Sequence, residues 1–293
     1  MDIVGRRKIW FAISLLVIIP GLISMAYKWV TLGSPLNLGI DFTGGNLINI
    51  EFKSDVTVAQ LRDVLREVDL EKSSIQMSGS RAAIIRTVVL DDKKQADLLS
   101  LLKDKIGPYD EEKLSISKIG PTIGKELTRN ALLALLISSV LMVVYISYRF
   151  EFKFGISAII ALLHDVFFTL GLFSIFWWEV DSTFVAAVLT IIGYSINDTI
   201  VIFDRIRENL NKRKKGEDLE HMVNKSIMQT LVRSINTVLT VVFILLALLI
   251  YGGATIKIFT LALLIGVVSG AYSSIFNASP MWVMLKGMEE GRA

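Results

Sequence analysis

Cysteine is absent from the 293 residues of this chain, and histidine occurs only at His164 and His221. A chain without cysteine forms no disulfide bond, carries no thiolate chemistry and offers no cysteine-based metal site. With only these imidazoles as possible ligands, the sequence also argues against a zinc enzyme. We therefore expect no metal ion, no cofactor and no enzymatic activity, and we expect no nucleic-acid partner.

Apolar residues, in contrast, are abundant: 53% of the chain is hydrophobic, and much of it lies in long uninterrupted runs. Such a composition is typical of membrane proteins. A helix needs roughly 20 apolar residues to cross the hydrocarbon core of a bilayer. Six stretches are long enough and predict an α-helical integral membrane protein with six transmembrane helices, at about residues 9–27, 130–148, 154–178, 183–203, 229–251 and 256–285.

The first apolar run has an alternative interpretation as a signal peptide. A basic GRRK segment precedes it, and Ser24-Met25-Ala26 resembles a small-x-small cleavage site. The run is nevertheless long enough to span a membrane, and the chain begins at Met1. We therefore expect a retained transmembrane helix.

Lysine and arginine predict the orientation of the helices, because cytoplasmic loops carry an excess of both. Basic residues cluster before the first span, between the second and third, in the segment 204–228 and after the sixth, whereas the opposite short loops are acidic or carry a single lysine. We expect both termini and the basic loop 204–228 in the cytoplasm. The residues that support this are Arg6, Arg7, Lys8, Arg149, Lys153, Arg205, Arg207, Lys212, Arg213, Lys214, Lys215, Lys225, Lys286 and Arg292.

The long segment between the first and second spans has the composition of a soluble domain. Its strand and helix patterns alternate as β-α-β-β-α-β, the order of the split ferredoxin-like unit. The patterns fall at residues 44–53, 57–70, 73–79, 82–90, 93–107 and 114–120. We divide the chain into residues 1–28, an extracytoplasmic α+β domain at 29–128, and the remaining helices at 129–293. The external domain carries no catalytic constellation and is interpreted as a binding or mechanical module, with a packed spacer as the alternative.

Ionisable residues inside the spans are the most informative feature, because such groups are costly in a bilayer and usually face a bundle interior or a water path. His164 and Asp165 lie near the middle of the third span. Asp198 lies in the fourth span and Arg233 in the fifth. At about 1.5 Å of rise per residue, antiparallel helices would place Asp198 and Arg233 at comparable depth. Neighbouring polar residues are secondary candidates: Tyr194, Ser195, Asn197, Asn236 and Thr237.

A carboxylate and a guanidinium at matching depth suggest a proton relay through Asp198, Arg233 and Thr237, the last one turn beyond Arg233 on the same face. Other interpretations stay open. Arg233 is close enough to the membrane surface to snorkel, Asp198 could be a protonated residue that joins two helices, and His164 with Asp165 could be structural. Ser195 as a nucleophile lacks the GxSxG context.

The sixth span combines small residues with a polar end. Gly266, Ser269, Gly270 and the pair Ser273-Ser274 have the spacing that lets helix backbones approach closely. Asn277 and Pro280 predict a polar, kinked end for this helix.

Five motifs occur in an order that resembles the SecF family of bacterial Sec protein-export subunits: LGIDFTGGNLINIEF, KIGPTIGKEL, ALLHDV, GYSINDTIVIFDRIREN and LVRSINT. The first contains the family signature Gly39, Asp41, Gly44 and Gly45. The resemblance covers essentially the whole chain and implies half of a resistance-nodulation-division type bundle. It also implies that Asp198, Arg233 and Thr237 match positions implicated in proton conduction.

The resemblance further implies a location in the bacterial inner membrane and the use of the proton motive force, with SecD, to promote late steps of protein translocation and membrane insertion. The implied partners are SecD, the SecYEG channel, YajC, exported or inserting polypeptide chains and membrane lipid. A covering partner is also a physical expectation, because one bundle would otherwise leave polar groups of the fourth and fifth spans against lipid. The alternatives are a proton-coupled efflux or lipid-export subunit and a passive scaffold for SecD, and sodium remains an alternative coupling ion.

Overall fold

The computed structural model describes residues 2–213 and 216–290. The chain folds into two compact units. One unit combines Met1–Asn37 with Leu133–Ala293, and the other is Leu38–Leu132. Of the basic residues used to predict orientation, Lys214, Lys215 and Arg292 lie outside the described residues.

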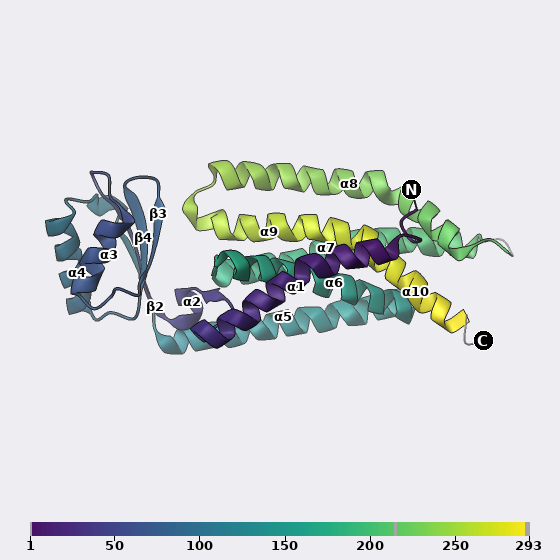
Figure 1. The fold of residues 1–293 in the computed structure, drawn as a ribbon, viewed down its shortest axis with the longest axis horizontal. Coiled ribbons are helices and arrows are strands. Elements are labelled where there is room, and N and C mark those ends of the chain that lie inside the picture. Colours follow the sequence, from purple (N-terminus) through teal and green to yellow (C-terminus); the bar gives the residue numbers. More distant parts are fainter. Residues whose placement is uncertain (1, 214–215, 291–293) are drawn as a thin grey trace. The chain divides into compact units, whose positions relative to one another are not determined.

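Long helices build the first unit, which we call the bundle (Figure 1). They are α1 (Arg7–Leu32), α5 (Pro121–Arg149), α6 (Phe152–Phe176), α7 (Ser182–Asn211), α8 (Leu219–Tyr251), α9 (Ala254–Ser273), the π-helix η2 (Ser274–Ala278) and α10 (Ser279–Glu290), α5 beginning in the other unit. In the described part of the chain, six helical stretches are long and apolar enough to cross a membrane. Each overlaps one predicted span, so the prediction of six helices long and apolar enough to cross a membrane is confirmed.

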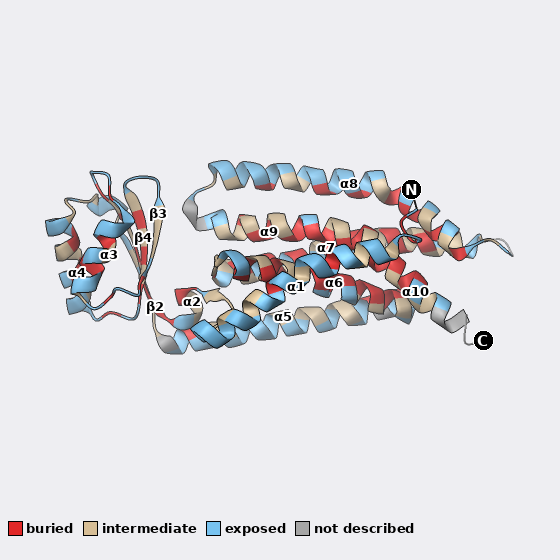
Figure 2. Cartoon of the chain, viewed as in Figure 1, coloured by how far each residue is buried: buried red, intermediate tan, exposed pale blue. Residues whose placement is uncertain are grey.

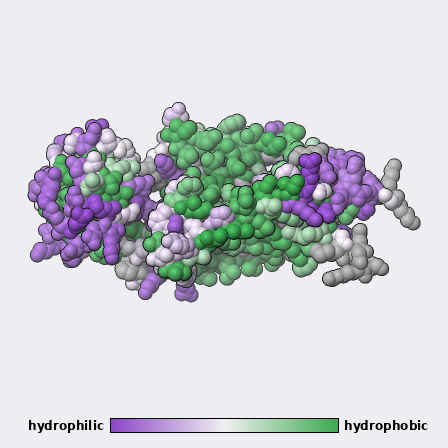
Figure 3. Space-filling model, viewed as in Figure 1, coloured by the Kyte–Doolittle hydropathy of each residue, from purple (hydrophilic) through white to green (hydrophobic). Residues whose placement is uncertain are grey.

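Burial separates the interior helices of the bundle from the peripheral ones (Figure 2). At least 44% of the apolar span is buried in α6, in α7 and in the continuous stretch from α9 to α10, against at most 17% in α1, α5 and α8. The peripheral helices expose large apolar side chains such as Leu16, Leu141 and Phe243. Figure 3 shows apolar residues over much of the visible face of the bundle. Such a surface suits lipid or another membrane protein rather than water.

Small residues let the interior helices approach closely. A Cβ added at Gly266 of α9 would lie 2.2 Å from Ile191 Cδ1 of α7, and one at Gly270 would lie 3.0 Å from Ser195 Cβ. Distances this short leave little room for a side chain at either glycine unless Ile191 or Ser195 moves. The predicted close packing along the sixth span is therefore confirmed, with α7 as the helix against which α9 packs.

The sixth membrane-spanning stretch changes from α-helix to π-helix near the polar residues that predicted a kink. The π-helix η2 contains Asn277 and ends before Pro280, so the irregularity begins slightly earlier than the sequence indicated. Asn277 is buried, and its Nδ2 donates a hydrogen bond of 2.8 Å to Ser14 Oγ of α1. A π-turn re-aims side chains within a helix and often occurs at functional sites.

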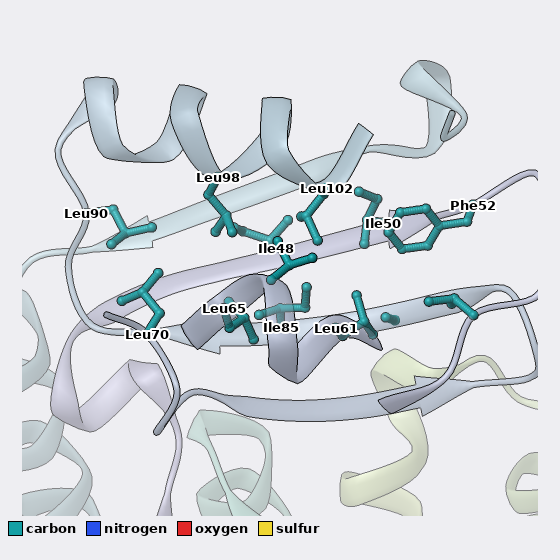
Figure 4. Packing of buried hydrophobic residues seen from close by; sticks show 13 residues of the cluster. Ile48, Ile50, Phe52, Leu61, Leu65, Leu70, Ile85, Leu90, Leu98 and Leu102 are labelled. Atoms are coloured by element: carbon teal, nitrogen blue, oxygen red, sulfur yellow. The ribbon is translucent and has the colours of Figure 1, made fainter. Parts of the chain in front are cut away.

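The second unit is a four-stranded antiparallel sheet covered on one face by two helices (Figure 4). The sheet order is β3-β4-β2-β5. Ile48 of the central strand pairs with Ile85, and Leu61 and Leu98 of the two helices pack onto this row. The elements are α2 (Ile40–Thr43), β2 (Gly45–Glu51), α3 (Val58–Glu67), β3 (Ser74–Ser78), β4 (Ala82–Thr87), α4 (Asp92–Lys105), the 3-10 turn η1 (Glu111–Lys113) and β5 (Ser115–Ile119). Two short strands lie outside this sheet: β1 (Asn37–Leu38), where the two units join along the chain, and β6 (Glu179–Val180), within the bundle.

Local signals in the sequence account for most element boundaries of this unit. Thr57 and Gln60 form a capping box at the start of α3, and Asp91 caps α4 by accepting a hydrogen bond from the Lys94 N–H. The predicted strand 82–90 is too long, because β4 ends at Thr87. The Leu90 N–H donates instead to the Asn46 side chain, a contact that the periodicity of the strand does not reveal.

Candidate functional site

Asp198 is held between α7 and α8 by a single hydrogen bond. Its side chain is buried, with 8% of the residue exposed, and its Oδ1 accepts a hydrogen bond of 2.7 Å from Ser234 Oγ. Its other oxygen, Oδ2, is buried and has no hydrogen-bond partner among the described residues. A carboxylate with one unsatisfied oxygen is costly to keep ionised in a membrane interior. Oδ2 is therefore an atom that can take up a proton or a further donor.

Arg233 is the neighbour of Ser234 on α8, but it does not pair directly with Asp198. Within the described residues, no carboxylate oxygen lies within 4.0 Å of its guanidinium, and the residue is exposed on the bundle surface. The charge is still near enough to act electrostatically on Asp198. The direct partner, Ser234, is the contact that sequence reasoning missed. Its only signal was a place in the polar run RSINT, where Arg233 is the more conspicuous residue.

Thr237 belongs to the same α7–α8 contact through its backbone. Its carbonyl oxygen accepts a hydrogen bond of 2.9 Å from the Tyr194 hydroxyl of α7. Its own hydroxyl stays within α8, where it lies 3.0 Å from the Arg233 carbonyl and 2.9 Å from the Ser234 carbonyl. Tyr194 and Asp198 are one helical turn apart, so both side chains connect α7 to α8 at neighbouring levels.

Asp165 forms a second polar centre in the bundle, where α6 and α9 meet α7. The residue is 0% exposed. Its Oδ1 contacts His164 Nδ1 at 3.0 Å and accepts a hydrogen bond of 2.6 Å from Ser269 Oγ. Its Oδ2 accepts hydrogen bonds of 2.6 Å from Ser195 Oγ and 2.7 Å from Ser273 Oγ. Both carboxylate oxygens are thus fully used, and α6, α7 and α9 are joined at one point.

The hydroxyl network continues from Ser195 towards the π-helix. The Ser195 carbonyl oxygen accepts hydrogen bonds of 3.2 Å from both Thr199 Oγ1 and Ser274 Oγ, and these hydroxyls lie 2.7 Å apart. Ser195 donates its hydroxyl to Asp165 and not to a histidine, so it does not form the Ser–His pair of a serine hydrolase. The structure gives Ser195 a role in joining helices.

Of the remaining candidates in the spans, two lie apart from these centres, and His164 belongs to the Asp165 centre through its Nδ1. Asn197 and Asn236 are exposed on the bundle surface. His164 is buried beside Tyr272 and Phe168, and its Nε2 has no hydrogen-bond partner among the described residues.

The glycine signature of the other unit places strict demands on the backbone. Gly39 precedes α2, the helix that contains Asp41. Gly44 and Gly45 follow with φ of 74° and 144°, values that other residues rarely adopt. A Cβ at Gly45 would also lie 2.3 Å from the Thr87 carbonyl oxygen. These glycines therefore allow the chain to turn tightly from α2 into the central strand.

Comparison with known proteins agrees with the resemblance seen in the motifs. Residues 100–288 match the family model described as "Protein export membrane protein SecD/SecF, C-terminal", and residues 29–56 match "SecD/SecF GG Motif". Protein translocase subunit SecF of Sebaldella termitidis is 40% identical over 98% of this chain and 92% of its own. SecF of Acidaminococcus fermentans is 42% identical, over 97% of each chain.

Longer relatives carry this sequence as part of a larger chain. Protein translocase subunit SecDF of Bacillus subtilis is 43% identical over 98% of this chain, which spans only 38% of SecDF. The crystal structure of SecDF from Thermus thermophilus, described as a translocon-associated membrane protein, superposes with a TM-score of 0.86 at 34% identity. The match covers 98% of this chain and 39% of the solved one. The chain belongs to the SecD/SecF family of protein export membrane proteins.

Proposed function

We propose that this chain is a SecF-type subunit of a Sec protein translocase and that it works with SecD to couple the proton motive force to late steps of protein translocation and membrane insertion. The family match and the SecF relatives of nearly the same length support the assignment. The observation that carries the coupling step is Asp198, a buried membrane carboxylate with one oxygen unsatisfied.

Protonation of Asp198 at Oδ2 would remove its charge and convert an unsatisfied acceptor into a donor. The electrostatic attraction between Asp198 and Arg233 would weaken, and the exposed guanidinium would then be free to pair with another carboxylate. The Ser234 hydrogen bond and the nearby Tyr194–Thr237 contact tie α7 to α8 at this level. Protonation of Asp198 would therefore first shift α8 relative to α7.

Partner contact is supported by polar residues on the outside of the bundle. Arg233, Asn236 and Thr237 of α8 and Asn197 of α7 are exposed within membrane-spanning helices. Polar and charged side chains at this depth are costly against lipid. We propose that a SecD bundle covers them, as suggested by relatives in which a single longer chain is named SecDF. SecYEG, YajC, lipid and the exported chain are proposed as further partners.

The topology proposed for the subunit follows its charge distribution. Both termini and the loop 204–228 lie on the cytoplasmic side of the bacterial inner membrane, and residues 29–128 lie outside, between the helix within 1–28 and the helices of 129–293. The sheet order β3-β4-β2-β5 and the two helices on one face support a ferredoxin-like class for the external domain. A rigid module of this kind suits a binding or mechanical role.

The experiment is protein translocation into vesicles that contain this chain, SecD and SecYEG, with and without a proton gradient. Asp198→Asn preserves the shape and the Ser234 contact but cannot exchange a proton. We expect the gradient-dependent part of translocation to disappear while the gradient-independent part stays. Asn197→Asp, with its substituted side chain on the exposed face, is the matched control and should not rescue Asp198→Asn. Full gradient dependence in Asp198→Asn would contradict the proposal.

A further inference from the structure

The turn between α5 and α6 joins two membrane-spanning helices by the shortest of connections. α5 ends at Arg149 and α6 begins at Phe152, so the connection consists of Phe150 and Glu151. So short a connection stays at the level of the lipid headgroups, where both helices leave the hydrocarbon core. Tyr148 and Phe152 on either side are 92% and 70% exposed, as is typical of aromatic residues at a membrane–water interface.

Two arginine side chains share a single carboxylate at this turn. Arg149 Nη2 lies 3.7 Å from Asp204 Oδ1 of α7, and Arg207 Nη2 lies 3.3 Å from the same oxygen. Within the described residues, neither arginine has another carboxylate within 4.0 Å. Glu151, the acidic residue of the turn itself, pairs instead with Lys286 at 3.0 Å. The two guanidinium groups therefore keep a net positive charge that attracts a further anion.

The ring of Phe150 holds both guanidinium groups in place. The guanidinium carbons of Arg149 and Arg207 lie 5.5 Å and 5.4 Å from its centroid, within the range of a cation–π interaction. The ring is itself fixed, because Phe150 is buried and its centroid lies 6.0 Å from that of Phe154 and 6.4 Å from that of Phe203. Arginines that are already ordered lose less conformational entropy when they bind a ligand.

The hydrogen-bonding capacity of Arg149 is unused among the described residues. Its guanidinium group carries five N–H donors, and Asp204 Oδ1, at 3.7 Å, is too distant to accept a hydrogen bond. Its side chain is 45% exposed. Arg207 differs, because its Nη1 donates a hydrogen bond of 3.2 Å to the Arg149 carbonyl oxygen and so caps the end of α5. Arg149 can therefore present two parallel N–H groups to the oxygens of a phosphate.

We propose that Arg149 and Arg207 bind the phosphate of an anionic glycerophospholipid, in the leaflet on the side of loop 204–228. Arg149 supplies the paired hydrogen bonds and Arg207 the second positive charge. Tyr145 and Leu141 precede Arg149 by four and eight residues on the same face of α5, and they are 52% and 63% exposed. This apolar face lies where the acyl chains of the same lipid would run, and a soluble phosphate would not use it. The inference rests on the proposed membrane location and gives the proposed lipid partner a site.

The absence of cysteine allows a single fluorescent label beside the site. Tyr148→Cys carries a bimane group in the full chain, which is assembled with a cysteine-free SecD in neutral detergent. Phosphatidylglycerol with brominated acyl chains is titrated, and quenching gives its apparent affinity. We expect Arg149→Gln to weaken this affinity at least about fivefold, the size expected when one cation that faces an anionic lipid is lost. Arg149→Lys keeps the charge without the planar fork and should give an intermediate loss.

The matched control is Lys212→Gln, which removes the same charge near the end of α7. Lys212 is already paired with Glu208 at 2.7 Å, so the affinity should change by less than about twofold. Brominated phosphatidylcholine, which has no net charge, should bind at least about fivefold more weakly than phosphatidylglycerol. Unlabelled phosphatidylglycerol should restore the fluorescence, and inorganic phosphate should not.

Three results would overturn the proposal: unchanged affinity in Arg149→Gln, an equal loss in Lys212→Gln, or no quenching in the assembled complex because a partner covers the turn. Recovery of fluorescence with inorganic phosphate would assign a soluble anion and overturn the lipid assignment. Thermal unfolding in lipid-free detergent checks that Arg149→Gln is folded, and Arg149→Lys carries the test if it is not. Quenching needs no transport and should be the same in Asp198→Asn, so a failure here is distinguished from a failure of the coupling role of Asp198.

Discussion

Asp165 and Asp198 are both buried carboxylates of the helical bundle, but their surroundings differ. Asp165 has four hydrogen-bonding neighbours, three of them serine hydroxyls, and both of its oxygens are used. Asp198 has one donor and one oxygen without a partner. The first arrangement stabilises a fixed charge distribution and holds three helices in register, and the second leaves a group that can change state. From this contrast we propose a structural role for Asp165 and proton exchange at Asp198.

The largest expected effect is loss of stability in Asp165→Ala. The substitution leaves the hydroxyls of Ser195, Ser269 and Ser273 buried without their acceptor, and we expect a cost of about 3–5 kcal/mol. Asp198→Ala, which removes one hydrogen bond, should cost only about 1–2 kcal/mol. Thermal unfolding of the purified complex in detergent measures both. Equal losses would remove the distinction between the two aspartates.

A smaller loss of stability is expected from a larger side chain at the close contact between α7 and α9. Gly270→Val places a larger side chain against Ser195, and the strain should cost about 1–3 kcal/mol. Gly193→Ala is the matched control on α7 itself, because a Cβ there meets no atom within 4 Å. We expect the control to unfold at nearly the wild-type temperature. A destabilised control, or a tolerated Gly270→Val, would show that α7 is not anchored on the side of Asp165.

Next in size is a pair of serine substitutions that separates stability from coupling. Ser234→Ala removes the only donor to Asp198, and we expect gradient-driven translocation to change by several-fold with a stability cost of about 1 kcal/mol. Ser269→Ala removes one of several donors to Asp165 and should have a similar cost without altering the gradient dependence. Translocation assays with and without a proton gradient, combined with unfolding curves, compare the two. Matching effects on coupling would contradict the contrast.

The fold was largely readable from the sequence, whereas the contacts at the two aspartates were not. Apolar runs and helical spacing predicted six spans and the strand–helix order of the second unit, because both depend on local periodicity. Depth along a helix placed Asp198 level with Arg233, but rise per residue says nothing of which side chain turns inwards. Ser234 is buried where Arg233 is exposed, and the cluster at Asp165 depends on α6, α7 and α9 meeting in space.

The smallest effect concerns Asp2, an exposed aspartate outside the membrane-spanning helices, whose titration contrasts with that of the two buried aspartates. Hydrogen bonds from the Gly5 N–H and the Asn224 amide lower the pKa of the Asp2 carboxyl. A lowered pKa means that these bonds stabilise the N-terminal segment above the unfolded pKa, and that the benefit is lost as the pH falls through the folded pKa. The hydrogen-exchange protection of residues 3–5, corrected for the intrinsic exchange rate at each pH, should therefore fall in acid.

The variant Asp2→Asn checks the assignment. It should remove the acid-dependent loss of protection and leave gradient-driven translocation unchanged. An acid-dependent loss of protection that persists in Asp2→Asn would assign the titration to another group.

Infrared difference spectroscopy of the assembled complex tests the central claim most directly. A pH jump should produce a protonated-carboxyl band, because one membrane carboxylate takes up a proton. The account predicts that this band is absent in Asp198→Asn and that Asp165→Asn, where the variant is folded, keeps it. A band that survives in Asp198→Asn and is lost in Asp165→Asn would exchange the roles of the two aspartates and contradict the account.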